Sequence, residues 1–354
     1  MKTMTKSIVI LVSVISCFLF TACEDTYSFE ETKKVETIKV AKLFNLNCAQ
    51  AQDLNILILP EAYRKEDMKY FERDAQKVLT TLRNTKPYSY MMDRLNIWYS
   101  TSFVSESKEL NSGMTAFACG SPHDREISLN EDSLANALEK TLLPKNRTVL
   151  LVLINTDAYI GYAVFSSNKE KPTQAICSAN DGYFATSVLH ELGHAIGFLA
   201  DEYDEDGIPA TEMTTTSLQR KQENGWFKNV STTSENVFWN MFIEDQAFAD
   251  EKAGVYVGGA GYVNGVYRST ENSIMRSHTP YYNGVSRLLI YKRMMFLHTG
   301  IEPSYTVFKL EDTSYPNVEW DWRSNNEPSN PQMTRAMNRA KGDKKFCSHS
   351  PMRE

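Results

Sequence analysis

The run Thr148–Asn155 (TVLLVLIN) constrains the fold more than any other stretch of this chain. It is almost unbroken in β-branched residues and leucine, a pattern typical of a strand that is buried on both faces. The short apolar run Leu54–Pro60 predicts a second buried strand, and Leu95–Phe103 predicts a third. Tyr162–Ser166 alternates more regularly and predicts an edge strand. We therefore expect one sheet whose central strands are covered on both sides.

Helical patterns separate these strands. The first apolar set recurs at helical spacing before Pro87 and comprises Met68, Phe71, Ala75, Val78 and Leu82. A second helix is expected over Ser133–Leu142, with Pro144 as its stop. Strands that alternate with helices indicate an α/β fold: a mostly parallel twisted sheet with covering helices.

The pattern weakens after about residue 200. Asp201–Ser277 is rich in Gly, Thr, Asn and Tyr and predicts an irregular C-terminal subdomain. A further helix is expected from Val285, with Gly300 as its C-terminal cap. The polar sequence from residue 306 to 354 predicts a weakly ordered tail. The folded domain is thus expected over residues 51–305, with an upper sheet and helix part (51–197) and a lower part (198–305).

The N-terminus has the features of an export signal. Lys2 and Lys6 precede an apolar run from Ile8 to Phe20, which is too short to span a bilayer as a helix. The small residues before Cys23 resemble a bacterial lipoprotein signal, in which the cysteine carries the lipid; the alternative is an ordinary secretory signal cut after Ala22. Residues 1–22 are therefore the expected signal peptide.

The predicted location follows from this signal. Residues 23–50 are polar and charged and are expected to tether the domain to a membrane through the lipid on Cys23. The acidic residues after Cys23 resemble surface-export signals of Gram-negative lipoproteins, which predicts an outer-membrane protein. The formal net charge of -6 argues against a nucleic-acid partner.

The chemistry concentrates in Thr186–Tyr203 (TSVLHELGHAIGFLADEY). His190 and His194 are four residues apart, so on a helix both imidazoles can reach one metal ion. Glu191 lies about 100° round the same helix, where it can reach a water at that metal without being a ligand. Two hydrogen-bonded histidines on an ordinary core helix are the alternative reading, but HExxH seldom arises by chance in a chain with six histidines.

A catalytic zinc site needs a third protein ligand. Gly197 is placed to end the helix and let the chain turn back, so that Asp201 and Glu202 return carboxylates toward the metal. Asp201 is the preferred candidate; Glu202 and the distant His278 remain open alternatives.

These motifs resemble the IgA-specific metallopeptidase family. The resemblance rests on HELGHAIGFLADEY and on three further stretches, LPEAYRKEDMKYFERDA, PYSYMMDRLNIWYSTSFVSES and GVYRSTENSIMRSHTPYYNGVSR, and it covers roughly residues 50 to 300. It implies a metzincin-like zinc peptidase with His190, His194 and Asp201 as ligands and Glu191 as the base. Met275 resembles the metzincin Met-turn, an apolar floor under the metal.

Two departures from relatives are visible. The metzincin third-ligand position, the tenth after the first histidine, is Ala200, which cannot bind a metal. Ser277 stands where astacins carry a tyrosine that stabilises the oxyanion. Four side chains compete for that role, which we leave unassigned: Tyr203, Arg276, Tyr281 and Tyr282.

The resemblance predicts zinc-dependent hydrolysis of a protein or peptide by a zinc-activated water, with one zinc ion per chain and Glu191 as general base. Tyr162–Ser166 is expected to hold the substrate extended by strand addition. The substrate stays open between immunoglobulin, other host glycoproteins and neighbouring cell-surface proteins. The alternative function is a non-catalytic surface lipoprotein that binds host protein or glycan on a peptidase scaffold.

The chain has six cysteines. Cys17 leaves with the signal peptide, and Cys23 is the expected lipid anchor. The remaining four allow up to two disulfides in an oxidising compartment, and spacing does not choose the pairing: Cys48, Cys119, Cys177 and Cys347.

Overall fold

The computed structural model describes residues 42–47, 53–123, 126–164, 172–204, 207–327 and 329. The predicted signal peptide, Cys23 and most of the predicted tether lie outside these residues. Within the described part of the chain, no helix has the length and apolar character needed to cross a membrane.

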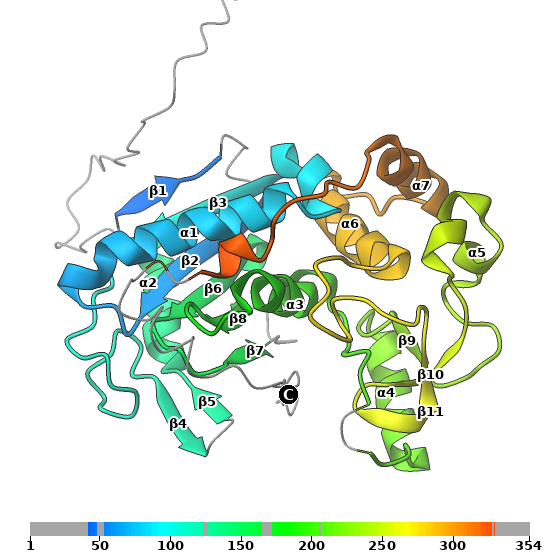
Figure 1. Ribbon diagram of the computed structural model, residues 1–354, viewed down its shortest axis with the longest axis horizontal. Coiled ribbons are helices and arrows are strands. Elements are labelled where there is room, and N and C mark those ends of the chain that lie inside the picture. The colour runs from blue at the N-terminus through cyan, green and yellow to red at the C-terminus, as the bar shows by residue number, and fades with distance from the viewer. Residues whose placement is uncertain are drawn as a thin grey trace, which may run out of the picture.

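A six-stranded sheet forms the centre of the molecule (Figure 1), with the strand order β1-β3-β2-β6-β8-β7. The four inner strands, β3, β2, β6 and β8, run parallel, whereas β1 and β7 are antiparallel edge strands. The bounds are β1 Leu43–Asn45, β2 Leu54–Glu61, β3 Leu95–Ser100, β6 Thr148–Ile154, β7 Gly161–Val164 and β8 Thr173–Ser178. The mixed α/β architecture with a mostly parallel sheet is therefore confirmed.

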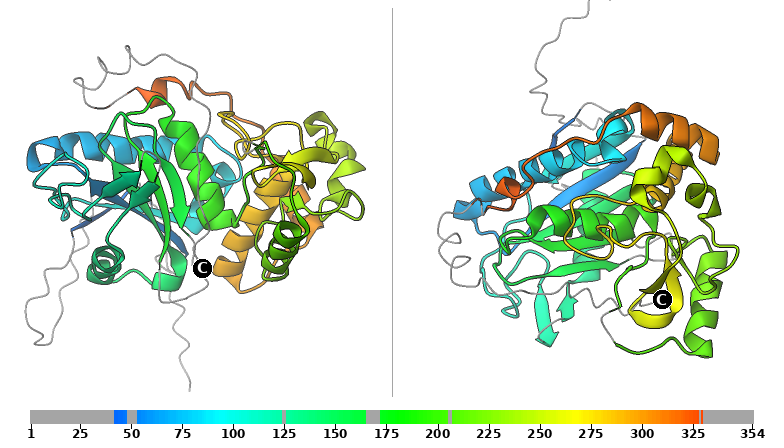
Figure 2. Two further views of the ribbon diagram at one scale, coloured as in Figure 1. Left: turned by 90° about the horizontal axis from the view of Figure 1, so that it is seen from below. Right: turned by 45° about the vertical axis from the view of Figure 1, so that its right-hand side comes forward.

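Side chains of the central strands alternate between two cores. Ile56 and Leu151 face one core, which also contains the apolar sides of α1 (Met68–Arg83) and α3 (Phe184–Gly197). Leu57 and Leu150 face the other core, which α2 (Glu131–Thr141) covers. Figure 2 shows these helices on opposite sides of the sheet. Burial on both faces explains why these strands are continuous apolar runs.

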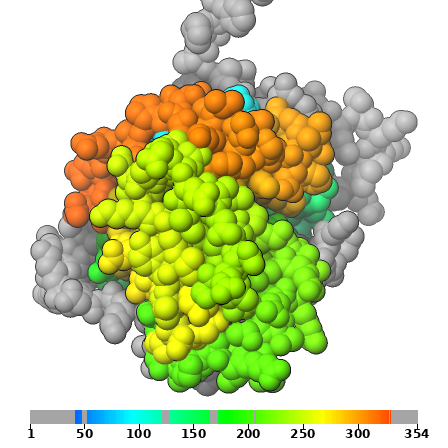
Figure 3. All heavy atoms as spheres, turned by 90° about the vertical axis from the view of Figure 1, so that its right-hand side faces the viewer, coloured from blue at the N-terminus to red at the C-terminus, as the bar shows by residue number. Residues whose placement is uncertain are grey.

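The second part of the molecule is built from shorter elements. Its three-stranded sheet has the order β10-β11-β9. Figure 3 shows the residues of this part, coloured from green to orange, over one face of the molecule. The bounds are α4 Glu212–Glu223, β9 Val230–Ser231, α5 Asn240–Ile243, β10 Tyr256–Gly259, β11 Tyr262–Arg268, α6 Gly284–Thr299 and α7 Tyr305–Ser314. A separate hairpin pairs β4 (Gly120–His123) with β5 (Glu126–Ser128). As predicted, Gly300 caps α6 in the left-handed conformation, with φ 76°.

Two boundary predictions are wrong. Residues 43–45, assigned to the tether, form β1, because their backbone pairs with β3. Residues 306–314, assigned to a weakly ordered tail, belong to α7 (Tyr305–Ser314), since Phe308 is buried in the main core and Asp312 bonds to Arg287. Residues beyond 329 lie outside the described part of the chain.

The cysteine prediction is corrected for two of its four members. Cys119 and Cys177 are free and buried, each in a different one of the two cores that flank the sheet. They therefore act as small apolar residues and form no disulfide. Cys48 and Cys347 lie outside the described residues.

Candidate metal centre

Helix α3 carries both histidines and lies in the middle of the protein. All fourteen of its residues are buried, between the main sheet and α6. A helix that is apolar around its whole circumference is stable only in such a position. Gly197 is its last residue, and Phe198 follows in a left-handed conformation with φ 51°. The chain therefore turns back at the place the sequence indicated.

This turn brings Asp201 against the two histidines. Oδ1 of Asp201 lies 2.9 Å from Nε2 of His190 and 3.2 Å from Nε2 of His194. The two Nε2 atoms are 3.1 Å apart. A tetrahedral zinc ion with bonds of about 2.0–2.1 Å separates its ligand atoms by roughly 3.3 Å. The three atoms thus have the spacing of one face of a zinc coordination sphere.

The remaining ring nitrogens determine what this cluster can bind. Nδ1 of His190 donates to the carbonyl of Ile274 at 2.9 Å, and Nδ1 of His194 donates to that of Leu199 at 2.7 Å. In neutral imidazoles both Nε2 atoms are then unprotonated, so two nitrogen lone pairs and a carboxylate oxygen meet. That arrangement is favourable only around a cation, so the residues present fit a metal ion.

The protonation behaviour of the metal-free cluster agrees with this demand for positive charge. Burial acts to lower the pKa of His194. The negative charge of Asp201 and the hydrogen bonds that His194 makes to Asp201 and to Leu199 O outweigh this effect and raise the pKa of His194 to about 9. Burial acts to raise the pKa of Asp201, yet His194 and His190 hold it well below its ordinary value. When no metal is bound, the two histidines and Asp201 therefore hold a proton between them, at the position that a metal ion would occupy.

Glu191 lies beside this cluster without joining it. Its side chain is buried, and among the described residues neither carboxylate oxygen has a hydrogen-bond partner. Burial raises its pKa to about 7, although His190 and His194 act to lower it. Gly161 of the edge strand β7 leaves the room this carboxylate occupies, since a β carbon there would lie 2.6 Å from Oε1. A buried carboxylate without a partner is suited to accept a proton from a water molecule.

Met275 lies beneath the helix. Its side chain is fully buried, and its sulfur would be 2.8 Å from a β carbon placed on Gly193. The preceding residue, Ile274, supplies the carbonyl that orients His190. One short turn therefore both supports α3 from below and fixes a histidine ring.

Glu202 is turned away from the cluster. Its carboxylate accepts hydrogen bonds from the Ser273 hydroxyl at 2.6 Å and from the amides of Asn229 and Asn283 at 3.1 Å. Its backbone N–H donates to Met275 O at 2.8 Å. These four contacts, which we call the Glu202 clamp, join the Asp201 segment to the Met275 turn and to the start of α6.

His278, the other alternative ligand, is also outside the His190–His194–Asp201 group. Its ring stacks on Tyr183 with 3.9 Å between centroids, and its Nδ1 lies 3.2 Å from the Thr186 hydroxyl. Burial lowers its pKa to about 3, with a smaller effect from His190. The ring is therefore neutral and is held against the first turn of α3.

The four tyrosine and arginine candidates for an oxyanion partner have separate surroundings. Tyr282 donates to Leu189 O, and Arg276 donates to Glu202 O at 3.1 Å. Tyr281 is about half exposed in a pocket on the other side of the Met275 turn. The ring of Tyr203 is nearly parallel to that of His190, at 6.5 Å between centroids. Of the four, only Tyr203 has its ring against a cluster histidine.

Sequence reasoning missed Gly161 and the three residues that hold Glu202. Gly161 and Asn229 lie outside the quoted motifs, and the motif that contains Ser273 and Asn283 gives no sign of their roles, because these roles come from contacts between segments far apart in the chain. The apolar–polar alternation of β7 identified an edge strand, but the sequence gives no sign that Gly161 would face Glu191.

The family model described as IgA Peptidase M64 matches residues 44–250, which is 207 of the 354 residues. The chain belongs to this family of metallopeptidases. Membership makes it a peptidase that acts on protein or peptide substrates, and it implies a bound metal. No curated protein matches the chain.

Proposed function

We propose that the protein is a zinc-dependent endopeptidase of metzincin-like architecture, with His190, His194 and Asp201 as metal ligands. The observation that carries this proposal is the convergence of two imidazole nitrogens and a carboxylate oxygen within 3.2 Å of one another, beside the buried carboxylate of Glu191, which has no hydrogen-bond partner among the described residues. The donor set of two imidazoles and one carboxylate matches the ligands that catalytic zinc takes in proteins. Met275, directly below, takes the place of the Met-turn.

When bound, zinc supplies Lewis acidity toward the scissile carbonyl and lowers the pKa of water. The protein supplies the proton transfers. Glu191 takes a proton from the attacking water and delivers it to the leaving amine, a task suited to a carboxylate whose pKa is raised to about 7. Ile274 O and Leu199 O hold the two imidazoles in the tautomer that presents Nε2.

The sheet edge supplies a track for the substrate. Strand β7 is the last strand of the six-stranded sheet, and its Gly161 adjoins Glu191. We propose that the substrate runs extended along this edge, so that its backbone is held beside the carboxylate. Such binding would select substrates by their extended backbone conformation more than by the identity of their side chains.

The decisive experiment compares Glu191→Gln with the wild type on a peptide library and measures the metal content of both. The variant is expected to keep about one zinc per chain and to lose cleavage by at least a hundredfold. Glu235→Gln, at an exposed glutamate, is the control and should cleave normally. Cleavage by Glu191→Gln at the wild-type rate would refute the role of Glu191. A wild-type protein without metal would support the non-catalytic binding role instead.

We further propose that the protein is a lipoprotein of the outer membrane of a Gram-negative bacterium, anchored through Cys23. The support is the charged start, apolar run and small residues before Cys23 in the sequence. Cys23→Ala should release the protein from the membrane fraction, which fractionation and lipid labelling would measure. A variant that stays in the membrane with no lipid would contradict the proposal.

The natural substrate is best approached through cleavage-site profiling on a mixed host and bacterial proteome. Immunoglobulin A, which the family description names, and other host glycoproteins are the first substrates to test. If the protein cleaves bacterial surface proteins and none of these host proteins, its role would be the processing of proteins on the bacterial surface.

A further inference from the structure

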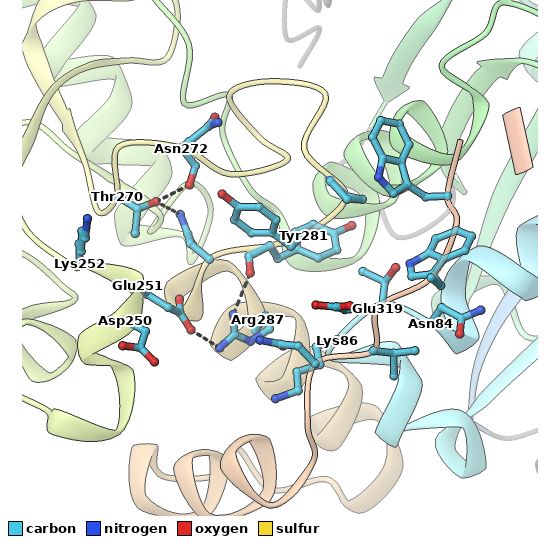
Figure 4. A pocket seen from close by; sticks show the side chains of 18 of the residues that line it. Asn84, Lys86, Asp250, Glu251, Lys252, Thr270, Asn272, Tyr281, Arg287 and Glu319 are labelled. Carbon is cyan, nitrogen blue, oxygen red and sulfur yellow. Dashed lines mark hydrogen bonds and ion pairs between the residues drawn. The ribbon is translucent and has the colours of Figure 1, made fainter. Parts of the chain in front are cut away.

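A large cavity is lined by the residues that flank the Met275 turn, Thr270–Asn272 and Pro280–Asn283. Its volume is about 640 Å³, within the range of about 300–1,000 Å³ that is typical of small-molecule sites. Figure 4 shows it between the end of α1, the residues before α6 and the C-terminal segment 317–322. Asn84, Tyr281 and Glu319 come from these three segments.

Aromatic side chains form part of its wall. Tyr281 is 49% exposed, and Trp320 and Trp322, which also line the cavity, are partly exposed. Tryptophan is rarely buried completely, so partial exposure of one ring is ordinary, but here these three aromatic residues line the same cavity. The guanidinium of Arg323 lies over the Trp322 ring, 4.6 Å from its centroid.

The rest of the lining is polar and carries charges of both signs. Lys252 and Asp250 lie on one side and Glu319 on the other (Figure 4). Glu319 is exposed and lines the cavity, and no ion pair or side-chain hydrogen bond engages it among the described residues, so its carboxylate is available to a ligand. The cavity thus combines apolar ring faces with groups that accept and donate hydrogen bonds.

The floor of the cavity is rigid. Arg287 is buried and pairs with Glu251 at 2.6 Å and with Asp312 at 2.8 Å, and it also donates to Tyr282 O. Its charge is therefore matched within the protein and is not offered to an anionic ligand. These bonds hold Glu251 and the Tyr282 backbone, which belong to residues that line the cavity, in place before a ligand arrives.

We propose that this cavity binds a saccharide, such as a glycan carried by a protein substrate. A sugar ring has one face of C–H groups, which packs on an aromatic ring, and a rim of hydroxyls, which donate to carboxylates and accept from amides and ammonium groups. The neutralised arginine speaks against an anion such as phosphate. The lack of any described strand along the cavity wall speaks against a peptide bound by strand addition.

The cavity is mechanically connected to the metal centre through the Met275 turn. Ile274 N donates to Tyr281 O at 2.8 Å, and Tyr282 donates to Leu189 O of α3. If the proposed peptidase function is correct, a glycan held here would position the polypeptide that carries it near Glu191. Saccharide binding itself does not depend on that function.

The test uses the purified full chain on an array of immobilised mannose-, galactose- and N-acetylglucosamine-terminated oligosaccharides. At least one class should be retained, and Trp320→Ala or Trp322→Ala should weaken its binding about tenfold. Tyr315→Ala removes a partly exposed ring just before that segment, which stacks on Tyr90 outside the cavity, and is the matched control. Glu319→Gln, at an exposed residue, gives a second variant with little risk to folding. Retention of no glycan, or undiminished binding by the folded variants, would overturn the proposal.

A separate readout keeps this result apart from the peptidase proposal. Glu191→Gln should bind the same oligosaccharide as the wild type while failing to cleave peptides. Trp320→Ala and Trp322→Ala should cleave a short unglycosylated peptide at the wild-type rate. Competition by that unglycosylated peptide for the cavity would show a peptide site and would refute the saccharide assignment.

Discussion

Gly161 and Glu191 are in such close contact that the strand has no room for a side chain there: a β carbon on Gly161 would lie 2.6 Å from Oε1 of Glu191. The edge strand β7 therefore packs against α3 so closely at this position that only glycine fits beside the Glu191 carboxylate. This contact places the backbone of the sheet edge beside the carboxylate that we assign as the base.

Gly161→Ala should strongly reduce cleavage while leaving metal content unchanged. The added methyl group displaces the Glu191 carboxylate, whereas it does not touch the three proposed ligand side chains. Misplacement of a catalytic group by about 1 Å costs on the order of a hundredfold in rate. Steady-state kinetics and metal analysis of the same preparation would check this, with Ala163→Gly in the same strand as control. Unchanged kcat in Gly161→Ala would contradict the contact.

Gly193 and Met275 form a second close contact, which a double-mutant cycle can test. Gly193→Ala should destabilise by about 1–3 kcal/mol, because its methyl group would lie 2.8 Å from the Met275 sulfur. Met275→Ala should cost about 2–5 kcal/mol through the cavity it leaves. The double variant should lose less than the sum, since each change relieves the other. Additive losses in denaturant unfolding would mean that the two side chains do not meet.

Asp201→Ala should lower metal affinity much more than Asp204→Ala. Oδ1 of Asp201 is within 3.2 Å of both histidine nitrogens, whereas Asp204 is partly exposed and lies 3.6 Å from Arg276. Titration with a competing chelator would compare the two variants with the wild type. Equal affinities in the two variants would exclude Asp201 as a ligand.

The metal-free protein should show a pH dependence that Glu191→Gln removes. Burial raises the pKa of Glu191 from 4.5 to about 7, so its protonated form is favoured in the folded state. Its contribution to stability is therefore complete below about pH 4.5 and is lost as the pH rises through about 7, by about 1.4 kcal/mol per pKa unit. Glutamine does not ionise. Urea unfolding of both proteins with chelator present should give a stability difference that shifts in favour of the variant as the pH rises. A stability difference that does not change with pH would show that the pKa of Glu191 is not raised in the folded protein.

Glu202→Ala should destabilise the fold and also weaken metal binding, although Glu202 is no ligand. The variant leaves the buried donors of Ser273, Asn229 and Asn283 without their acceptor, at a cost of roughly 2–4 kcal/mol. It also removes the side-chain part of the Glu202 clamp and leaves only the backbone bond to Met275 O between the Asp201 segment and the Met275 turn. Thermal unfolding with and without metal would measure both effects, and Glu271→Ala at an exposed site is the control. Full metal affinity in Glu202→Ala would show that the clamp does not position Asp201.

The sequence predicted the parts of this protein that local patterns encode. Continuous apolar runs predicted β2 and β6, and the spacing of His190 and His194 predicted a shared face of α3, since both follow from one element alone. Strand β8 was missed because it begins with the polar residues Thr173 and Gln174 and therefore lacks a long continuous apolar run. The Glu202 clamp and the cavity were also missed, because they join residues that lie tens to hundreds of positions apart.

The opposite directions of Asp201 and Glu202 limit how this segment can vary in length. Asp201 O and Tyr203 O accept from Ala260 and Gly261 on one side, while Glu202 bonds to Met275 on the other. Successive residues of such an extended segment exchange sides. A deletion of one residue between Phe198 and Asp201 would bring Glu202 to the position of the proposed ligand, whereas an insertion would bring Ala200 there and Asp201 to the position of Glu202. The turn can therefore accept substitutions, but a change in its residue count would take Asp201 away from the two histidines.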